Sequence, residues 1–416
     1  MGISGFTKFY KSLLRKHVPS EYAGKIVLID AMQKLYQLCI GHRCSGKELT
    51  RKDGKSINHL LSIFIFTMKL LEKGILPVFV FDGKRTVEKL RTIKERKDQK
   101  IKAEHMYESL REEYSHGIES NSGEIIKYYK RSFSISPEQM NECKYVLHLM
   151  GVPYIQCPEE ADQQCAVVSN YDKLNIAGVI TEDSDVLVFG GTKILKDFSV
   201  KDNETYEINR DDILPFLKEK ANKFLQQKKL KEIDFTNDNF IDFSIVMGTD
   251  YKISSSNCII LNCPISEKYE KLFEIFVLND CNVEKMINYM NTENLKLQAN
   301  GKVIMYKIPP DFIENWKNTR EVYENSVVID PKEIDLTFKK PNINKLIKFL
   351  CTKNELDLSK IKCKAKILYE NYLIFNKIQS DKLHSRSTLK SYQYKYFRNM
   401  IKKQIVNDKI YMLLIK

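Results

Sequence analysis

The sequence is poor in the residues and patterns that mark several classes of protein. It has seven histidines and no Cys-x-x-Cys pair among its ten cysteines, so neither a zinc site nor a disulfide-rich scaffold is expected. It has no run of eighteen apolar residues, so no transmembrane helix is predicted, and its polar N-terminus does not resemble a signal peptide. These absences predict an intracellular protein with reduced thiols.

The sequence is rich in positive charge. Of its 416 residues, 67 are Lys or Arg and 54 are Asp or Glu, which gives a formal net charge of +13. A hydrophobic content of 43% can supply a core for one large domain or for two or three smaller ones. Such a basic chain predicts a polyanionic partner, with nucleic acid as the first choice and an anionic membrane surface as the second.

Seven acidic residues lie at turns in the first 250 residues, several of them directly after apolar runs. They are Asp30, Asp82, Glu160, Asp162, Asp183, Asp185 and Asp250. Parallel strands deliver their ends to one edge of a sheet, and carboxylates gathered there repel one another unless hard cations bind between them. The pattern therefore predicts a Mg²⁺ or Mn²⁺ cluster, which favours phosphate chemistry.

Apolar runs alternate with stretches of helical periodicity along the first half of the chain. Strands expected at 25–30 and 75–81 alternate with helices expected at 31–42 and 57–73, which is the pattern of a parallel α/β sheet. Further along, the pattern predicts a helix at 137–150, strands at 152–156, 178–181 and 186–189, and helices at 211–230 and 237–247.

Residues 84–135 differ from this pattern because they are highly charged and lack a clear apolar stripe. Between Lys84 and Lys102 there are nine basic residues against three acidic ones. The segment is predicted to be largely helical and inserted into the α/β domain after its second strand. Lys89 and Arg96 are seven residues apart, so they are expected on one face of a helix.

Six segments of the chain resemble the flap endonuclease / XPG-like group of 5′ structure-specific nucleases. In order they are MGISGF, VLIDA, VFVFDGK, PEEADQQCA, TEDSDVLVFG and VMGTDY. The similarity runs from residue 1 to about 250 and resumes more weakly at 308–370. It implies a PIN-like α/β fold with a mostly parallel central sheet, an inserted helical arch and a mostly helical C-terminal region. The implied divisions are 1–83 and 136–251 for the two halves of the nuclease domain, 84–135 for the arch, 252–300 for a degenerate duplex-binding region, and 301–416 for a C-terminal wrap with a basic tail.

The resemblance also implies roles for particular residues. The seven carboxylates would bind two Mg²⁺ ions, for which Mn²⁺ can substitute, although the family usually has Glu where Asp162 stands. Lys89 and Arg96 align with a basic catalytic pair that contacts the scissile phosphate. The implied DNA contacts are Gly2, Tyr36, Arg43, Lys130 and Arg131, while Ser134 replaces a third family lysine.

The chain departs from the family pattern after Asp250. The segment 252–263, KISSSNCIILNC, has no glycine where the family has a Gly-rich hairpin that grips duplex phosphates. Duplex binding and a monovalent cation at this place are therefore in doubt. No sliding-clamp box is recognisable, since QYKYF at 393–397 does not fit the pattern. The basic stretch 382–409 either adds affinity for DNA or forms a solvated helix.

Together these features predict a two-metal endonuclease and 5′-exonuclease that cuts branched or flapped DNA near duplex–single-strand junctions, in replication, repair and recombination. Two alternatives remain open: an RNA endonuclease of the same superfamily, and a noncatalytic scaffold that binds junctions. The Lys- and Asn-rich composition suggests a poxvirus member. The expected location is then the host cytoplasm, whereas a cellular member would be nuclear.

Overall fold

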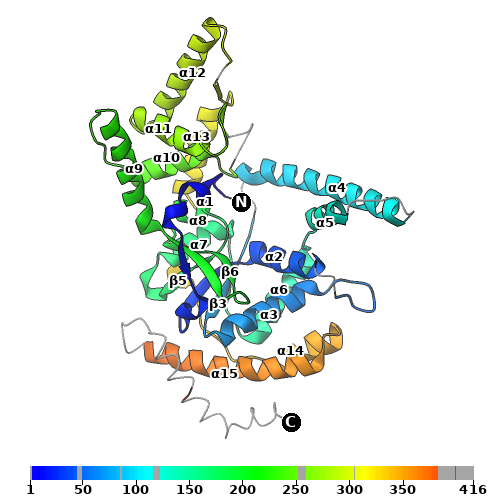
Figure 1. The fold of residues 1–416 in the computed structure, drawn as a ribbon. Helices are drawn as coiled ribbons and strands as arrows, with labels where there is room; N and C mark the ends of the chain where they lie inside the picture. Colours follow the sequence, from blue (N-terminus) through cyan, green and yellow to red (C-terminus); the bar gives the residue numbers. More distant parts are fainter. Residues whose placement is uncertain are drawn as a thin grey trace.

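A seven-stranded sheet lies at the centre of the computed structural model, which describes residues 2–44, 49–84, 87–115, 122–251, 259–303, 305–382 and 399 (Figure 1). Its strands are β1 Arg15–His17, β2 Ile26–Asp30, β3 Leu76–Phe81, β4 Tyr154–Gln156, β5 Ile176–Ile180, β6 Lys193–Ser199 and β7 Glu204–Asn209. Their order across the sheet is β1-β7-β6-β5-β2-β3-β4. The pairs β2–β3, β2–β5, β3–β4 and β5–β6 are parallel, and only the two pairs that β7 makes are antiparallel. The expected mostly parallel sheet is thus confirmed.

The central strands are apolar on both faces because helices cover both sides of the sheet. Along β2, Val27 and Ile29 belong to one hydrophobic core, and Leu28 between them belongs to the other. This division follows from the period of two in a strand, which sends successive side chains to opposite faces. The β2 and β3 strands run in register, with Asp30 opposite Val80, so their C-terminal ends reach the same edge.

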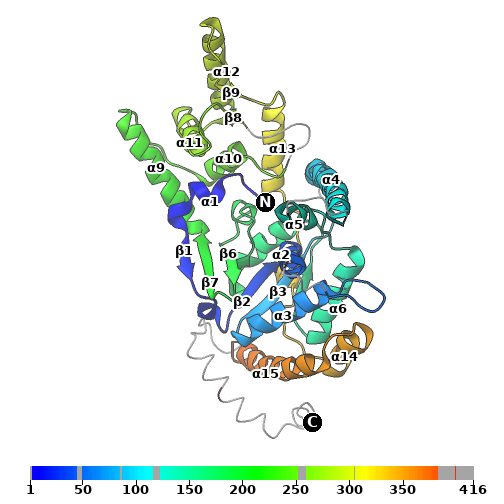
Figure 2. The ribbon, with the colours of Figure 1, turned by 45° about the vertical axis from the view of Figure 1, so that its right-hand side comes forward.

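Helices from the first half of the chain cover the two faces of the sheet. Figure 2 shows α2 Ala31–Cys44, α3 Asn58–Glu72 and α6 Pro137–Met150 on one face. The other core contains residues of α7 Ala161–Ser169, α8 Asp185–Val188, α9 Ile213–Gln227 and α10 Asn237–Met247. The helices expected at 31–42, 57–73, 137–150, 211–230 and 237–247 are confirmed. The α6 helix begins at a capping box formed by Ser136 and Gln139, as its Ser-Pro start favours.

One strand prediction is wrong. Residues 186–189 were expected to form a strand, but Asp185–Val188 form the short helix α8. The run VLVF is short and apolar, and such a run cannot be assigned to a strand or a buried helix from periodicity alone. The turn before it decides the outcome, because the backbone N–H of Asp185 donates to Asp183 Oδ1 at 3.0 Å and starts a helical turn. The side chains of Val186, Leu187 and Val188 are still buried.

The charged insertion forms two helices that project from the body of the protein (Figure 1). They are α4 Val87–Ser115 and α5 Ser122–Arg131, and they pack against each other. The rings of Tyr107 and Tyr129 lie 5.0 Å apart between them. Lys100 on α4 donates to the hydroxyl of Ser134 at 2.7 Å, just beyond α5. The helical character predicted for 84–135 is therefore confirmed for the described residues.

The C-terminal half of the chain is mostly helical and is found at opposite ends of the molecule. At one end lie α11 Lys268–Leu278, α12 Val283–Ala299, α13 Phe312–Glu324 and a small antiparallel pair of β8 Ile260–Leu261 and β9 Tyr306–Lys307. At the other end, α14 Ile343–Ile347 and α15 Leu358–Lys382 lie beneath α3 and α6 (Figure 1). An ion pair between Lys364 and Glu72 joins α15 to α3.

Short helical segments complete the described chain. They are α1 Phe6–Phe9, η1 Lys11–Leu13, η2 Pro19–Tyr22, η3 Asp172–Leu174, η4 Arg210–Asp212, η5 Pro331–Glu333 and the π-helical turn η6 Lys348–Lys353. Within the described residues, no helix has the length and apolar character needed to cross a membrane. Most of the glycine-free segment 252–263, at 252–258, and nearly all of the basic stretch 382–409 lie outside the described residues, as does QYKYF at 393–397.

Candidate active site

The seven predicted carboxylates lie along the C-terminal edge of the parallel strands. Asp30 is the last residue of β2, Asp82 directly follows β3, and Asp183 and Asp185 lie in the turn from β5 to α8. Glu160 is the N-cap residue of α7, and Asp162 is in the first turn of that helix. Asp250 follows the end of α10. Helix and strand ends therefore bring acids from 220 residues of sequence to one place, as the strand-end argument predicts.

Backbone hydrogen bonds orient three of these carboxylates. Asp30 Oδ1 accepts from the N–H of Gln33 at 3.1 Å, and Asp82 Oδ1 accepts from the N–H of Ala161 at 2.8 Å. Asp183 Oδ1 accepts from Asp185 at 3.0 Å. Each contact fixes one oxygen of its carboxylate.

Burial makes the ionisation of these clustered carboxyl groups unfavourable when no cation is present. Asp162, Asp183 and Asp185 are at most 7% exposed, and burial raises the pKa of all three, with further contributions from neighbouring carboxylates. Burial and the charge of Asp82 raise the pKa of Asp30 to about 7. A site in which buried carboxylates oppose one another's ionisation is a site that favours bound positive charge.

Two basic residues of the arch supply positive charge to this site. The Lys89 ammonium lies 3.1 Å from Glu160 Oε2 and 3.6 Å from Asp162 Oδ2, and 4.6 Å from the centre of the Tyr251 ring. Burial alone would lower the pKa of Lys89, but Tyr251 and the carboxylates around it hold that pKa well above its ordinary value. Lys89 is thus a buried, charged counterion.

Arg96 approaches the same group of acids from two helical turns further along α4. Its guanidinium donates to Asp250 Oδ2 at 2.6 Å, and Thr92 between the two basic residues donates to the carbonyl of Asp250 at 2.7 Å. Lys89, Thr92 and Arg96 therefore share one face of α4, as their spacing predicts. This face attaches the base of the arch to the acidic edge of the sheet.

The donor set fits a hard divalent cation. Asp162 Oδ1 and Asp185 Oδ2 are buried and have no hydrogen-bond partner among the described residues. Buried oxygens of this kind require either a proton or a cation, and Mg²⁺ prefers carboxylate oxygen. In this conformation, no group of three or more His, Cys, Asp or Glu side chains in the described chain is arranged to hold a metal ion. Lys89 and Arg96 instead occupy oxygens of Glu160, Asp162 and Asp250.

The N-terminal segment closes one side of the site. The N–H of Gly2 lies 3.4 Å from Asp250 Oδ2, and the N–H of Ile3 donates to the Ser184 hydroxyl at 3.2 Å. Gly2 has a φ of +77°, and a Cβ added there would lie 2.2 Å from Asp183 Oδ1. Only glycine fits this place without displacing a carboxylate. The structure therefore puts Gly2 beside the carboxylates.

The remaining predicted DNA contacts lie on α2 and α5. Tyr36 is half-buried on α2, and its ring packs edge-on against Phe133 at 5.4 Å. Lys130 and Arg131 are exposed at the end of α5. The side chain of Arg43 lies outside the described residues. The structure thus brings Lys89 and Arg96 into contact with the carboxylates, while Tyr36 lies on α2 and Lys130 and Arg131 lie on α5.

Three residues around the carboxylates were not predicted from the sequence. Thr92 and Tyr251 are sequence neighbours of predicted residues, so their positions could have been anticipated from Lys89 and Asp250. Tyr323 could not, because it lies 138 residues beyond Asp185, whose Oδ1 its hydroxyl contacts at 3.0 Å. No local pattern in the sequence connects these two residues.

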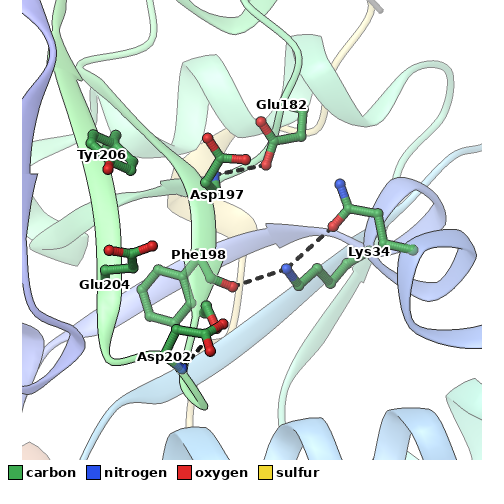
Figure 3. A pocket seen from close by; sticks show the side chains of 9 residues that line it. Lys34, Glu182, Asp197, Phe198, Asp202, Glu204 and Tyr206 are labelled. Atoms are coloured by element: carbon green, nitrogen blue, oxygen red, sulfur yellow. Dashed lines mark hydrogen bonds between the residues drawn. The ribbon is translucent and has the colours of Figure 1, made fainter. Parts of the chain in front are cut away.

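A separate surface pocket of about 570 Å³ lies beside the acidic edge, between α2 and the β6–β7 hairpin (Figure 3). Lys34, Phe198 and Tyr206 line it together with four carboxylates, those of Glu182, Asp197, Asp202 and Glu204. It contains none of the seven predicted metal ligands. The pocket is therefore distinct from the candidate active site.

Comparison with known proteins agrees with this geometry. Residues 1–103 match the XPG N-terminal domain and residues 151–250 match the XPG I-region, which together contain all seven carboxylates. The flap endonuclease 1 of Nematostella vectensis is 29% identical over 374 residues, covering 88% of this chain and 87% of that protein. Human flap endonuclease 1 is 27% identical over 374 residues, covering 88% of this chain and 86% of that protein.

A solved structure shows the same fold. The catalytic core of Rad2 in complex with DNA substrate matches with a TM-score of 0.60 and 22% identity, covering 88% of this chain and all of that one. The suggested poxvirus origin stays a prediction. By the two matched regions, the curated relatives and the shared fold, the chain is similar to the flap endonuclease/XPG-like nucleases.

Proposed function

We propose that this protein cuts phosphodiester bonds of DNA near junctions between duplex and single strand, using divalent metal ions. The observation that carries the proposal is the contact between the arch and the acidic edge, where Lys89 and Arg96 meet Glu160, Asp162 and Asp250. A cation-binding edge next to basic groups suits a negatively charged substrate. The relatives named flap endonuclease 1 and the Rad2 core solved with DNA substrate support DNA as that substrate.

The metal ions are proposed to be two Mg²⁺, with Mn²⁺ as a substitute. The seven carboxylates of Asp30, Asp82, Glu160, Asp162, Asp183, Asp185 and Asp250 would hold them. When bound, two such ions activate water and stabilise the leaving oxygen of an in-line displacement at phosphorus. The chain's own oxygens supply this site without histidine or cysteine, which favours Mg²⁺ over zinc.

The basic residues act by changing partners. Lys89 and Arg96 neutralise carboxylates in the structure described here, and bound metal ions would take over that role. The ammonium and the guanidinium would then be released to the phosphate oxygens of the scissile bond, where negative charge develops in the transition state. Because both groups lie on α4, one displacement of this helix would release both of them.

Residues further from the metals would guide the DNA strand. The half-buried ring of Tyr36 is proposed to stack on a base next to the scissile phosphate, a contact that tolerates any sequence. The exposed Lys130 and Arg131 on α5 would bind backbone phosphates of the strand that passes beneath the arch. These three residues would recognise the shape of the DNA rather than its base sequence.

The test is cleavage of end-labelled DNA with a 5′ flap, a nick, a splayed end or a four-way junction, in Mg²⁺, Mn²⁺ or EDTA. Wild type is compared with the double variant Asp183→Asn/Asp185→Asn. The expected result is metal-dependent incision near the junction that the variant loses by at least about a thousandfold while DNA binding persists. A matched control is Asp202→Asn/Glu204→Gln, which neutralises two acids of the separate pocket and should cleave normally.

Two outcomes would replace the proposal. Binding of junctions without cleavage in any metal would identify a noncatalytic scaffold. Preferential cleavage of the RNA strand, when the flap is made of RNA, would identify an RNA endonuclease, because recognition of the 2′-OH distinguishes the two sugars. The seven carboxylates alone do not separate these substrates.

A further inference from the structure

A tyrosine from the C-terminal region contacts the innermost carboxylate of the candidate metal site. Asp185 is fully buried, and its Oδ1 accepts a hydrogen bond of 3.0 Å from the hydroxyl of Tyr323, which is 6% exposed. The other oxygen, Oδ2, has no hydrogen-bond partner among the described residues. The tyrosine thus engages one carboxylate oxygen and leaves the second for a cation.

The helix that carries Tyr323 is fixed by a second, partly buried polar contact. On α13, the indole N–H of Trp316 and the guanidinium of Arg320 both donate to Asp242 Oδ1 of α10, at 2.8 and 2.7 Å. Trp316, Arg320 and Tyr323 follow the i, i+4, i+7 spacing, so they lie on one helical face. Anchoring Trp316 and Arg320 on α10 therefore fixes the direction in which Tyr323 points.

Aromatic packing holds the tyrosine ring in place. Its centre lies 4.7 Å from that of Phe189, at the end of α8, and 5.6 Å from that of Tyr251, which follows Asp250. Tyr251 directly follows the predicted ligand Asp250, and Phe189 directly follows α8, which begins with the predicted ligand Asp185. With the ring confined on two sides, the hydroxyl has little freedom to leave Asp185.

We propose that Tyr323 is a positioning residue that orients Asp185 for metal binding, an inference that rests on the proposed function. A hydrogen bond to one oxygen of a ligating carboxylate restricts its rotation and directs its other oxygen toward the ion. Tyr323 itself touches neither the metal nor the substrate. The C-terminal region beyond residue 301 then completes the metal site rather than only wrapping the nuclease domain.

The experiment is Mn²⁺ binding to the full chain without DNA, measured from the free Mn²⁺ signal by electron paramagnetic resonance. Tyr323→Phe keeps the ring and removes the hydroxyl, and its Kd for Mn²⁺ is expected to rise about tenfold. Tyr10→Phe is the matched control, because Tyr10 is fully buried and its hydroxyl has no hydrogen-bond partner among the described residues. Its Kd should equal that of wild type. Thermal melting in EDTA confirms that each variant is folded.

A second pair of variants separates this inference from the proposed function. Asp185→Asn should weaken Mn²⁺ binding, and adding Tyr323→Phe to it should cause no further loss, because the two residues act as one unit. If Asp185→Asn binds weakly but Tyr323→Phe binds like wild type, the positioning role is overturned and the metal site stands. If wild type binds no Mn²⁺, or Asp185→Asn binds it normally, the proposed metal site fails and this inference fails with it.

Discussion

Replacing Lys89 by Met should destabilise the protein mainly when no metal is bound. The ammonium is the nearest cation to Glu160 and Asp162, and its side chain is only 10% exposed. Removing one partner of a buried ion pair leaves the other charge uncompensated and costs about 3–5 kcal/mol. With an entropy of unfolding of about 2.1 cal/mol/K per residue, a chain of 416 residues should lose roughly 3–6 °C in Tm.

Millimolar Mg²⁺ should restore most of this loss, because the ion compensates the same carboxylates that Lys89 neutralises. The assay is thermal unfolding of wild type and Lys89→Met, each in EDTA and in Mg²⁺. Lys34→Met is the control, because Lys34 Nζ donates to the carbonyl of Phe198 at 3.1 Å and contacts none of the seven carboxylates. The decrease in Tm caused by Lys34→Met should be the same in EDTA and in Mg²⁺. An equal loss for Lys89→Met with and without Mg²⁺, or no loss at all, would refute the reasoning.

Three further predictions concern other parts of the molecule. Gly2→Ala should reduce cleavage and Mn²⁺ affinity at least about tenfold, because the Cβ of the alanine would displace the Asp183 carboxylate. The control is Gly54→Ala, at a φ of +79° with open space around it, which should change neither quantity. Titration of both variants with Mn²⁺ measures the difference. Arg320→Met should cost about 3 kcal/mol in urea unfolding by leaving the buried Asp242 without its cation; an unchanged unfolding midpoint would contradict this. Burial lowers the pKa of His59 more than its contact with Glu142 raises it. His59 therefore contributes stability above its unfolded pKa of about 6.5, which is lost as pH falls toward the lower folded value. His59→Gln should show a flatter pH dependence of the free energy of unfolding below that pH, and a parallel profile would contradict the assignment.

Much of the fold could be predicted because its signals are local. The apolar runs that became β2 and β3 are flanked by helical patterns, and each ends at an acidic residue. The α6 helix has Ser136 as its N-cap and Pro137 as its first residue, and it ends at a glycine with a φ of +74°, as capping rules favour. The run after Asp185 was mistaken for a strand because four apolar residues have no distinctive period, and a carboxylate-capped turn made them helical.

In the candidate site too, the residues with local signals could be predicted from the sequence, and the contacts that depend on tertiary packing could not. The carboxylates of the site were predicted because strand ends converge in a parallel sheet, and Lys89 and Arg96 because they align with the basic pair of the family that the sequence resembles. That both would pair with the carboxylates themselves was not predicted, since the contact depends on how the inserted helix packs against the sheet edge. The contact between Tyr323 and Asp185 could likewise not be predicted from the sequence, because it depends on the packing of α13 against α10.

The most direct test of the account is where divalent ions bind. Crystals of the protein with Mn²⁺ should give two peaks of anomalous scattering at the C-terminal edge of the sheet. Both are expected among the seven predicted carboxylates, with Lys89 and Arg96 released from their carboxylate partners. Absence of any peak at this edge under saturating Mn²⁺, with the two ion pairs intact, would contradict the account.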